Sequence, residues 1–361
     1  MPTLATLATP AVLVDRVRLA ANIRAMQDEC DRHGVELRPH LKTHKLVAVA
    51  RQQLAAGARG FTCAKLGEAE ALLPSGLRSL FVAHSLVDPG LAPRLAALAE
   101  QLADLRVAVT SEAQLEGLLR VAAVGRKLRV MLAVDTGLGR EGVRGDPAAV
   151  RLAARLARCP QLELCGFYTH EGHFYGVPRE QLAAQAAELV DRLCALRDAI
   201  DPALAVWPGC SVSAALVARA GAGRVQAVRP GAYVFGDLSL TRTTGIMPAA
   251  AVALQVLATV VDKPEPGLAL IDAGSKTFSS DRTPDGLSAR AADGRDVAVA
   301  RVNEEHGYLR GGGVDALQIG ERVAFTPAHV CTVINLTDTV VVTEGGQPVD
   351  TWRVEARGRT Q

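Results

Sequence analysis

The chain has 361 residues, of which 49% are hydrophobic and 22% charged, with a formal net charge of +2. These values predict a soluble globular protein large enough for one large and one smaller domain. The small net charge and the scattered Lys and Arg exclude the broad basic surface of a nucleic-acid-binding protein. No apolar run reaches the roughly 18 residues of a membrane span, and residues 1–10 do not resemble a secretory signal. Seven cysteines without a CxxC pair indicate the reducing cytoplasm rather than a disulfide framework.

Between residues 35 and 235, short β-branched or apolar runs alternate with Ala-, Leu- and Arg-rich segments of helical periodicity. We expect strands at 35–40, 60–64, 79–84, 106–110, 128–134, 162–169, 205–210 and 225–229. The segments between them, such as 92–105, 148–157 and 180–200, are expected to be helices. This alternation predicts an α/β fold, a (β/α)8 TIM-like barrel over residues 14–238, with a doubly wound open sheet as the alternative.

After about residue 240 the sequence changes to short β-rich runs separated by Gly- and Asp-rich turns. The expected strands are 252–261, 268–271, 297–302, 322–325, 330–336 and 339–342. This pattern predicts a second, mainly β domain over residues 239–361, on which residues 1–13 pack.

Polar and titratable residues gather at the predicted carboxyl ends of the barrel strands, where the active sites of such barrels lie. The first strand leads into Lys42, and positive charge from His40, His44 and Lys45 would favour the neutral amine needed for Schiff-base chemistry. A solvated basic loop is the alternative. The turns at 209–213 and 231–232 could present backbone N–H groups to a phosphate, or could simply be turns.

Residues 137–142 match the pattern GxGxxG, and Glu163 follows about 20 residues later, as in a dinucleotide-binding fingerprint. We discount this interpretation because the motif follows the fifth predicted strand, whereas the fingerprint usually follows the first. Arg140 and Glu141 would also place charge in a turn that should be tight and neutral.

His329 and Cys331 lie in or beside a predicted strand, in which alternate residues share a face. An imidazole and a thiolate could therefore converge on one cation, and this ligand pair suits zinc with water or substrate completing the site. A buried histidine and an inert cysteine are the alternative. The sequence EEHG at 304–307 could add a ligand nearby or form an exposed turn.

Several motifs follow one another along nearly the whole chain: TP at 9–10, VLVD at 12–15, RPHLKTHK at 38–45, DTGLGREGV at 135–143, YTHEGHFYG at 168–176, RPGAYVFGD at 229–237, DAGSK at 272–276, EEHG at 304–307 and PAHVC at 327–331. In these motifs the sequence resembles the D-serine dehydratase / D-threonine aldolase family of fold-type III pyridoxal-phosphate enzymes, relatives of alanine racemase. The resemblance implies a barrel and a β-domain in a homodimer. It also implies pyridoxal 5′-phosphate and a divalent metal, with zinc expected first and manganese as the alternative.

The resemblance further implies site residues. Lys42 would carry the cofactor and act as the catalytic base, and Arg140 would lie beside the phenolic oxygen of the cofactor. The remaining assignments are Tyr168 and Tyr175 in the cofactor and substrate pocket, Ser211, Gly231 and Ala232 at the phosphate, His329 and Cys331 at the metal, and either Arg229 or Tyr168 at the pyridine nitrogen. The sequence GCSVSA at 209–214 departs from the GSTPT-like pattern of many members.

The implied activity is that of a lyase acting on D-3-hydroxy amino acids. The His-x-Cys pair and YTHEGHFY are similar to the D-serine dehydratase branch, which eliminates water to give a 2-keto acid and ammonia. The candidate substrates are D-serine and D-threo-3-hydroxyaspartate. D-threonine aldolase activity, giving glycine and an aldehyde, is the alternative. More distant alternatives are an amino-acid racemase, for which Tyr308 is the only tyrosine after residue 239, and a non-catalytic carrier of the cofactor.

Overall fold

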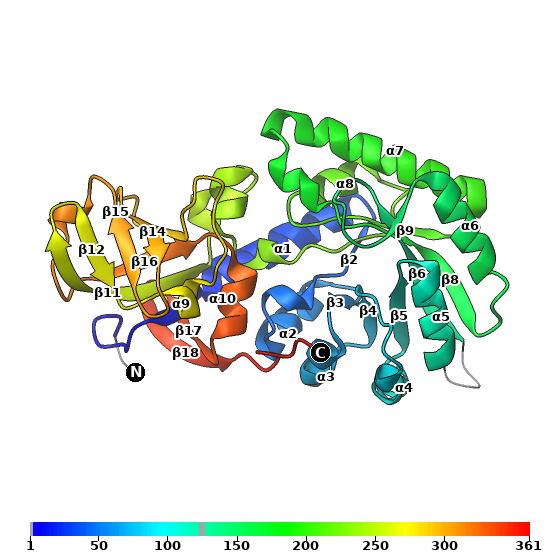
Figure 1. The fold of residues 1–361 in the computed structure, drawn as a ribbon, viewed down its shortest axis with the longest axis horizontal. Coiled ribbons are helices and arrows are strands. Elements are labelled where there is room, and N and C mark those ends of the chain that lie inside the picture. The colour runs from blue at the N-terminus through cyan, green and yellow to red at the C-terminus, as the bar shows by residue number, and fades with distance from the viewer. Residues whose placement is uncertain (1–2, 123–126) are drawn as a thin grey trace. The chain divides into compact units, whose positions relative to one another are not determined.

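The computed structural model describes residues 3–122 and 127–361. The chain divides into two compact units, which we describe separately. The barrel unit comprises Ala25–Lys42, Val49–Gly231 and Arg359–Gln361, and the β unit comprises Met1–Arg24, Thr43–Ala48 and Ala232–Gly358. Figure 1 shows the elements of both units with their labels.

Parallel strands form the centre of the barrel unit. They are β2 (Glu36–Leu37), β3 (Phe61–Cys63), β4 (Ser79–Val82), β5 (Asp104–Val109), β6 (Leu128–Asp135), β8 (Leu162–Tyr168), β9 (Ala205–Trp207) and β10 (Ala227–Val228), and β6 also pairs with the short β7 (Val143–Arg144). These positions agree with the eight strands predicted from the alternation of apolar and helical runs.

Hydrogen bonds close the strands into a ring. The strands β3, β4, β5, β6, β8 and β9 pair in that order, and β10 pairs with β2. The amide of Gln226 donates to the carbonyl of Val206 at 3.2 Å, which joins β10 to β9, and the amide of Thr62 donates to the carbonyl of Pro39 at 2.9 Å, which joins β2 to β3. The prediction of a (β/α)8 barrel is therefore confirmed, and the open-sheet alternative is excluded.

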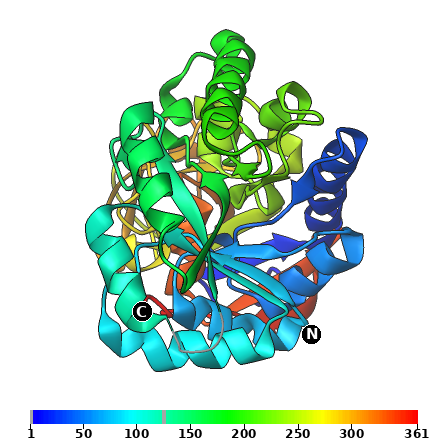
Figure 2. The same cartoon turned by 90° about the vertical axis from the view of Figure 1, so that its right-hand side faces the viewer.

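Helices surround these strands, as Figure 2 shows. They are α2 (Val47–Ala56), α3 (Leu66–Leu72), α4 (Ala92–Gln101), α5 (Glu112–Val121), α6 (Asp146–Leu156), α7 (Leu182–Ile200) and α8 (Ala214–Ala220), while α1 (Arg16–Arg32) runs from the β unit into the barrel unit. In α6, for example, the buried residues Ala149, Leu152, Ala153 and Leu156 recur at helical spacing, so that one stripe packs inward.

The interior of the barrel combines large aromatic side chains with alanines. Phe81, Tyr168 and Trp207 belong to one buried cluster, and the ring of Phe81 meets the other two edge-on at centroid distances of 4.8 and 5.8 Å. The guanidinium groups of Arg38 and Arg106 lie 4.4 and 4.5 Å from the Trp207 ring. This packed interior holds the strand ends that carry the polar residues described below.

The β unit is built around a mostly antiparallel sheet. Its strands are β1 (Ala11–Asp15), β11 (Leu254–Glu265), β12 (Leu268–Ile271), β13 (Ala289–Ala291), β14 (Ala298–Val302), β15 (Gly307–Arg310), β16 (Arg322–Pro327), β17 (Thr339–Glu344) and β18 (Gln347–Arg353). The order β12-β15-β14-β13-β16-β11 closes on itself because β12 also pairs with β11, and β1, β17 and β18 extend the sheet from β11. The predicted mainly β second domain is therefore confirmed.

The expected strand at 330–336 is wrong, because this segment forms the helix α10 (Val330–Leu336). Its β-branched residues favour a strand, but a short apolar run does not by itself distinguish a strand from a helix. Val330, Val333 and Ile334 are buried at helical spacing, and the amide of Val330 donates to the Asp237 carboxylate at 3.2 Å. The β unit also contains the short helix α9 (Ser275–Phe278).

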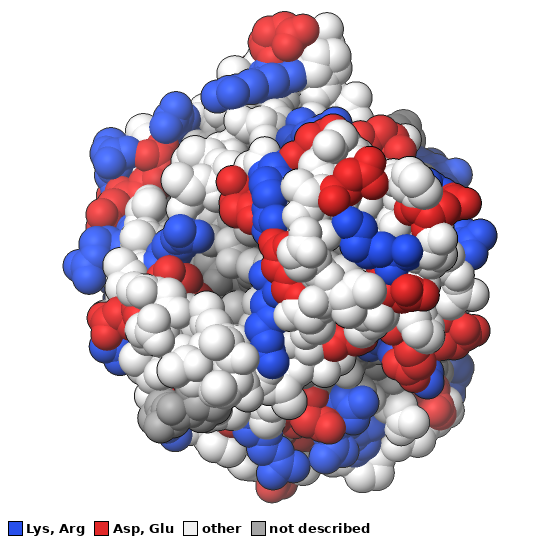
Figure 3. Space-filling model, turned by 90° about the vertical axis from the view of Figure 1, so that its left-hand side faces the viewer, with Lys and Arg blue, Asp and Glu red and all other residues white. Residues whose placement is uncertain are grey.

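On the face shown in Figure 3, basic and acidic side chains are interspersed, without a broad region of one sign. Within residues 3–122 and 127–361, none of the helices combines the length and apolar character needed to cross a bilayer. All seven cysteines lie within these ranges and are free thiols.

Candidate active site

A cavity of about 250 Å³ lies in the barrel unit at the carboxyl ends of the strands. Its lining includes Lys42, Arg140, Tyr168 and Arg229, together with His40, His84, Glu141 and His170. The barrel therefore brings together side chains from strand ends that are far apart in the sequence, as expected for this fold.

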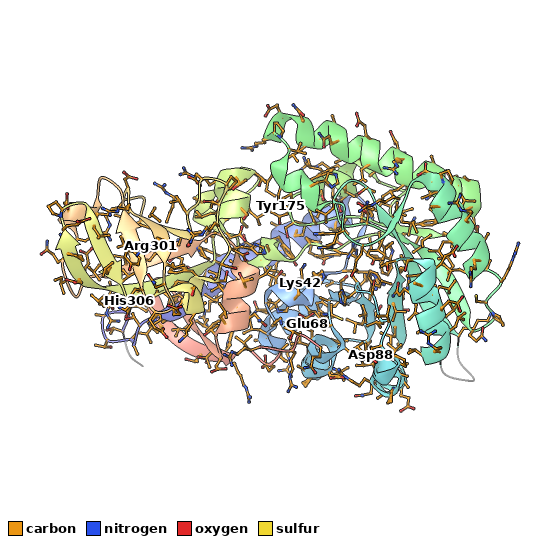
Figure 4. All side chains as sticks on the ribbon, viewed as in Figure 1. Lys42, Glu68, Asp88, Tyr175, Arg301 and His306 are labelled. Atoms are coloured by element: carbon orange, nitrogen blue, oxygen red, sulfur yellow. The ribbon has the colours of Figure 1, made fainter. Side chains whose placement is uncertain are left out.

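Lys42 lies in a single 3₁₀ turn, Leu41–Thr43, that follows β2. The backbone before it is fixed on both sides, because the amide of His40 donates to the carbonyl of Pro230 at 2.9 Å and His40 forms a parallel bridge with Thr62. The side chain is half-buried and lines the cavity. Figure 4 labels it on the ribbon.

The positive charges around the cavity differ from those suggested by the flanking sequence. Lys45 belongs to the β unit, where its ammonium group donates to the Asn335 amide oxygen at 2.8 Å. The cationic side chains that line the cavity with Lys42 are those of Arg140 and Arg229. Because Arg140 and Arg229 are far from Lys42 in the sequence, the residues that flank Lys42 could not predict them as its neighbours.

Two histidines beside Lys42 are held in their neutral form. Burial lowers the pKa of His170 to about 2, and the charges of Lys42 and Arg140 act in the same direction. Burial also lowers the pKa of His40 well below its usual value, again with Lys42 contributing. Each imidazole therefore stays unprotonated at neutral pH and keeps a nitrogen lone pair that can accept a hydrogen bond.

Arg229 and Tyr168 reach the cavity together. The guanidinium of Arg229 lies 5.0 Å from the centroid of the Tyr168 ring and donates to the backbone carbonyls of Trp207 and Thr169. Burial lowers the pKa of Arg229, and burial raises the pKa of Tyr168 well above its usual value. Tyr168 is therefore a neutral phenol that can donate a hydrogen bond into the cavity.

Arg140 is presented by a loop that Asp135 organises. One carboxylate oxygen of Asp135 accepts from the amides of Gly137 and Gly139 at 3.0 and 3.1 Å, and the other accepts from Arg144 Nε at 3.1 Å. The glycine amides of the GxGxxG match are thus already bonded to an anion, an arrangement that opposes binding of a pyrophosphate. The loop instead places Arg140 at the cavity.

Ser211 and Gly231 are adjacent in the barrel unit, since the Gly231 amide donates to Ser211 Oγ at 3.1 Å. Both residues are buried, as is Ala232, the next residue in the chain. Within residues 3–122 and 127–361, no protein acceptor is found for the amide of Ser211, whereas the Val212 amide points toward the Cys210 sulfur. A buried amide without an acceptor is costly, so this turn suits an anionic ligand that accepts from it.

Tyr175 is the predicted pocket residue that does not line the cavity. It is half-buried in the 3₁₀ segment Gly172–Gly176, which follows β8 beyond Tyr168. Figure 4 labels it in the same view as Lys42. Its assignment to the substrate pocket stays a prediction.

His329 and Cys331 lie together at the start of α10, although not by the strand alternation that the sequence suggested. His329 immediately precedes the helix and Cys331 lies in its first turn. The sulfur of Cys331 lies 3.2 Å from the Thr43 hydroxyl. The charge on this sulfur raises the pKa of His329 to about 11, and the hydrogen bond to Asp237 acts in the same direction, against burial.

Asp237 fixes the orientation of His329. Its Oδ2 lies 2.9 Å from His329 Nδ1 and also accepts from the Val330 amide, while Oδ1 accepts from the Leu240 amide at 3.0 Å. The carboxylate is fully buried and supports the pair rather than offering a free ligand. A carboxylate on one imidazole nitrogen leaves the other nitrogen for a metal, which would replace the proton that the raised pKa of His329 otherwise keeps there; this is the usual arrangement at metal-bound histidines.

No cluster of three or more His, Cys, Asp or Glu side chains placed to hold a metal occurs in the part of the chain that the structure describes. The EEHG segment forms an exposed turn in which Glu305 pairs with Lys276 at 2.5 Å. A metal at His329 and Cys331 would therefore take its remaining ligands from water or substrate.

Sequence reasoning gave no role to Asp237, His170 or Glu171. Asp237 closes the motif RPGAYVFGD, and the other two lie in YTHEGHFYG, so the motifs themselves were the available signal. Their roles depend on partners that the fold brings from other strands and loops.

Comparisons with known proteins agree with this structure. Residues 14–239 match the family described as "Alanine racemase, N-terminal domain", and residues 253–343 match that described as "Putative serine dehydratase domain". The D-threonine aldolase of Arthrobacter sp. is 31% identical, with 98% of this chain and 94% of the relative covered. The D-threo-3-hydroxyaspartate dehydratase of Delftia sp. (strain HT23) is 34% identical, with 91% and 92% covered.

Among solved structures, a Cys→Ala mutant of D-threo-3-hydroxyaspartate dehydratase in the metal-free form has a TM-score of 0.85 and 31% identity, covering 98% of this chain and 99% of that one. The resemblance inferred from the sequence motifs is thus confirmed. The chain belongs to the alanine racemase N-terminal domain family and, within it, to the group that contains D-threonine aldolase and D-threo-3-hydroxyaspartate dehydratase.

Proposed function

We propose that the protein is a pyridoxal-phosphate- and divalent-metal-dependent lyase of D-3-hydroxy amino acids that removes water to give a 2-keto acid and ammonia. The observation that carries the proposal is the cavity in which the Lys42 amine lies with Arg140, Arg229 and two neutral histidines. The dehydratase and aldolase relatives support the choice of reaction class.

The residues present fit the cofactor. Lys42 supplies an amine for covalent attachment, and the Ser211 amide, with Gly231 and Ala232, would supply donors for a phosphate. When bound, pyridoxal phosphate supplies a conjugated ring that stabilises negative charge at the substrate Cα. Arg140 would lie at its phenolic oxygen, and Arg229 or Tyr168 at its ring nitrogen.

The protein's own groups then orient the substrate and move protons. The Lys42 amine, once it no longer holds the cofactor, takes the proton from Cα. His40 and His170 stay uncharged, so they can accept hydrogen bonds without adding a second cation beside this amine. Tyr168 and Arg229 line the cavity at the ends of β8 and β10.

The pair His329 and Cys331 fits a divalent metal, zinc in our proposal, with manganese as the alternative. Nitrogen and sulfur donors suit zinc, and Asp237 leaves Nε2 of His329 as the coordinating atom. A metal held there supplies Lewis acidity for the leaving β-hydroxyl. The metal-free form of the similar dehydratase mutant supports a metal in this group.

Retro-aldol cleavage to glycine and an aldehyde is the second candidate function. The 31% identity to a D-threonine aldolase across 98% of this chain favours it. The two reactions need the same residues and cofactors and differ in whether a base removes the Cα proton or the hydroxyl proton.

We also propose a homodimer, which sedimentation of the purified protein would test.

The decisive experiment supplies D-serine, D-threo-3-hydroxyaspartate and D-threonine to the holoenzyme, with and without a chelator. We expect ammonia and a 2-keto acid from the first two substrates and neither product from L-serine. Glycine and an aldehyde as the main products would favour the aldolase. Racemisation of D-alanine without any lyase product would overturn the proposal.

A further inference from the structure

Glu171 is fully buried in the barrel unit, three residues after Tyr168 at the end of β8. Its Oε1 accepts from the Gly209 amide at 2.7 Å and from the Ser213 hydroxyl at 3.0 Å. The same hydroxyl oxygen accepts from the Cys210 amide at 3.0 Å. One carboxyl group therefore holds both ends of the turn at 209–213, which contains Ser211.

This arrangement determines which amides of the turn remain available. Gly209 and Cys210 direct their amides inward, to Glu171 and Ser213, and the Val212 amide points toward the Cys210 sulfur, whereas the Ser211 amide has no acceptor among the described residues. Gly209 adopts a φ of +105°, a conformation that side chains rarely allow, and a Cβ there would lie 2.9 Å from Val228 Cβ. Position 209, whose amide donates to Glu171, therefore requires glycine.

The second oxygen of the carboxyl group, Oε2, is buried and has no hydrogen-bond partner within the described residues. A buried anionic oxygen without a donor is costly, and a neutral acid is much less so. Burial raises the pKa of Glu171, while its own backbone amide, the charge of Arg229 and the donors Gly209 and Ser213 oppose this effect.

We propose that Glu171 is a positioning residue for the cofactor phosphate, and that its uncharged carboxyl group holds the 209–213 turn so that the Ser211 amide faces the phosphate. A neutral acid fixes the turn without placing a negative charge beside a phosphate dianion. This inference rests on the proposed function only in assuming that the turn binds the phosphate of pyridoxal phosphate.

The test compares the affinity of the apoprotein for pyridoxal phosphate with its affinity for pyridoxal, which lacks the phosphate. Glu171→Ala should lower the first affinity about tenfold or more, because two buried hydrogen bonds that shape the turn are lost, and should leave the second nearly unchanged. Glu171→Gln keeps the accepting oxygen and the neutral charge, so its preference for the phosphorylated compound should remain within about threefold of wild type.

Two further variants complete the test. Ser213→Ala removes one of the contacts to Oε1 and should reduce the preference severalfold even if Glu171→Ala does not fold. Glu29→Ala removes a buried carboxylate that pairs with Arg219 in the same unit, so it controls for general destabilisation and should not alter the preference.

Loss of the preference in Glu171→Gln equal to that in Glu171→Ala would overturn the neutral-acid role. An unchanged preference in both Glu171→Ala and Ser213→Ala would overturn the positioning role. Failure of the wild-type protein to bind either compound would instead contradict the proposed function. Inorganic phosphate should compete with pyridoxal phosphate in wild type and compete less well in Glu171→Ala.

Discussion

The cavity of the barrel unit and the His329–Cys331 pair of the β unit are constructed in different ways. The cavity takes its residues from the ends of several strands, and the closed backbone ring places each of them. The pair comes from a single helical turn, and one buried carboxylate, that of Asp237, orients its histidine. Substitution of one cavity residue should therefore leave the positions of the others unchanged. The orientation of His329, in contrast, depends on the single side chain of Asp237.

The largest effect should come from Lys42→Ala, which removes the amine from the cavity and leaves the barrel intact. We expect the yellow colour of covalently bound cofactor to disappear and turnover to fall about a thousandfold or more, since the same amine is the proposed base. Borohydride reduction of the wild-type protein followed by peptide mass spectrometry should find the label on Lys42. A label on Lys45 or Lys276 would contradict the assignment.

The second-largest effect should come from substitution of the proposed metal ligand His329 in the β unit. His329→Ala should reduce kcat about a hundredfold or more, because a Lewis acid at the leaving hydroxyl contributes several kcal/mol. The visible absorption of the cofactor should remain, and bound zinc measured by mass spectrometry should be lost. His306→Ala, in the exposed turn of the same unit, is the matched control and should keep both metal and activity. Full activity in protein freed of metal would end this interpretation.

A smaller effect should follow from Asp237→Asn. The amide keeps the size of the side chain but weakens the support of His329, so metal affinity should fall about tenfold to a hundredfold. The control is Asp281→Asn, because Asp281 accepts from the Thr332 hydroxyl of the same helix at 2.6 Å without contacting the imidazole. Competition with a chromogenic chelator measures both affinities. Equal affinities in the two variants would show that Asp237 does not orient the ligand.

The smallest effect concerns the stability of the barrel unit as a function of pH. The pKa of His170 falls from about 6.5 to about 2 on folding, so between these values the unfolded chain binds the extra proton. Above pH 6.5, His170 does not change the free energy of unfolding. As the pH falls from 6.5 toward 2, it lowers this free energy progressively. His170→Gln should lose less stability than wild type between pH 7.5 and pH 5 in urea unfolding. An identical loss in both proteins would contradict a buried neutral histidine.

The barrel strands could be predicted because buried parallel strands are short apolar runs that alternate with amphipathic helices. In the β unit, β13 (Ala289–Ala291) and β15 (Gly307–Arg310) could not, because they are short and rich in Ala, Gly or Arg. Their strand pairing comes from neighbours across the sheet rather than from their own composition.

In the candidate site, too, some residues could be predicted from the sequence and others could not. The motifs identified Lys42, Arg140 and Tyr168 as residues at strand ends, and the structure brings these three to one cavity. They could not identify Asp237 or Glu171 as supports, since the contacts of Asp237 with His329 and of Glu171 with Gly209 join residues distant in sequence. Such contacts depend on tertiary structure and have no local periodic signal.

The helix α10 also has a consequence for the synthesis of the chain. The segment VCTVINL carries no charge and is rich in β-branched residues, so before it is capped it can pair as a strand with another chain. Asp237, which accepts from the Val330 amide, precedes this segment by more than 90 residues and therefore leaves the ribosome first. Its carboxylate is therefore already available to accept from the Val330 amide when the segment emerges.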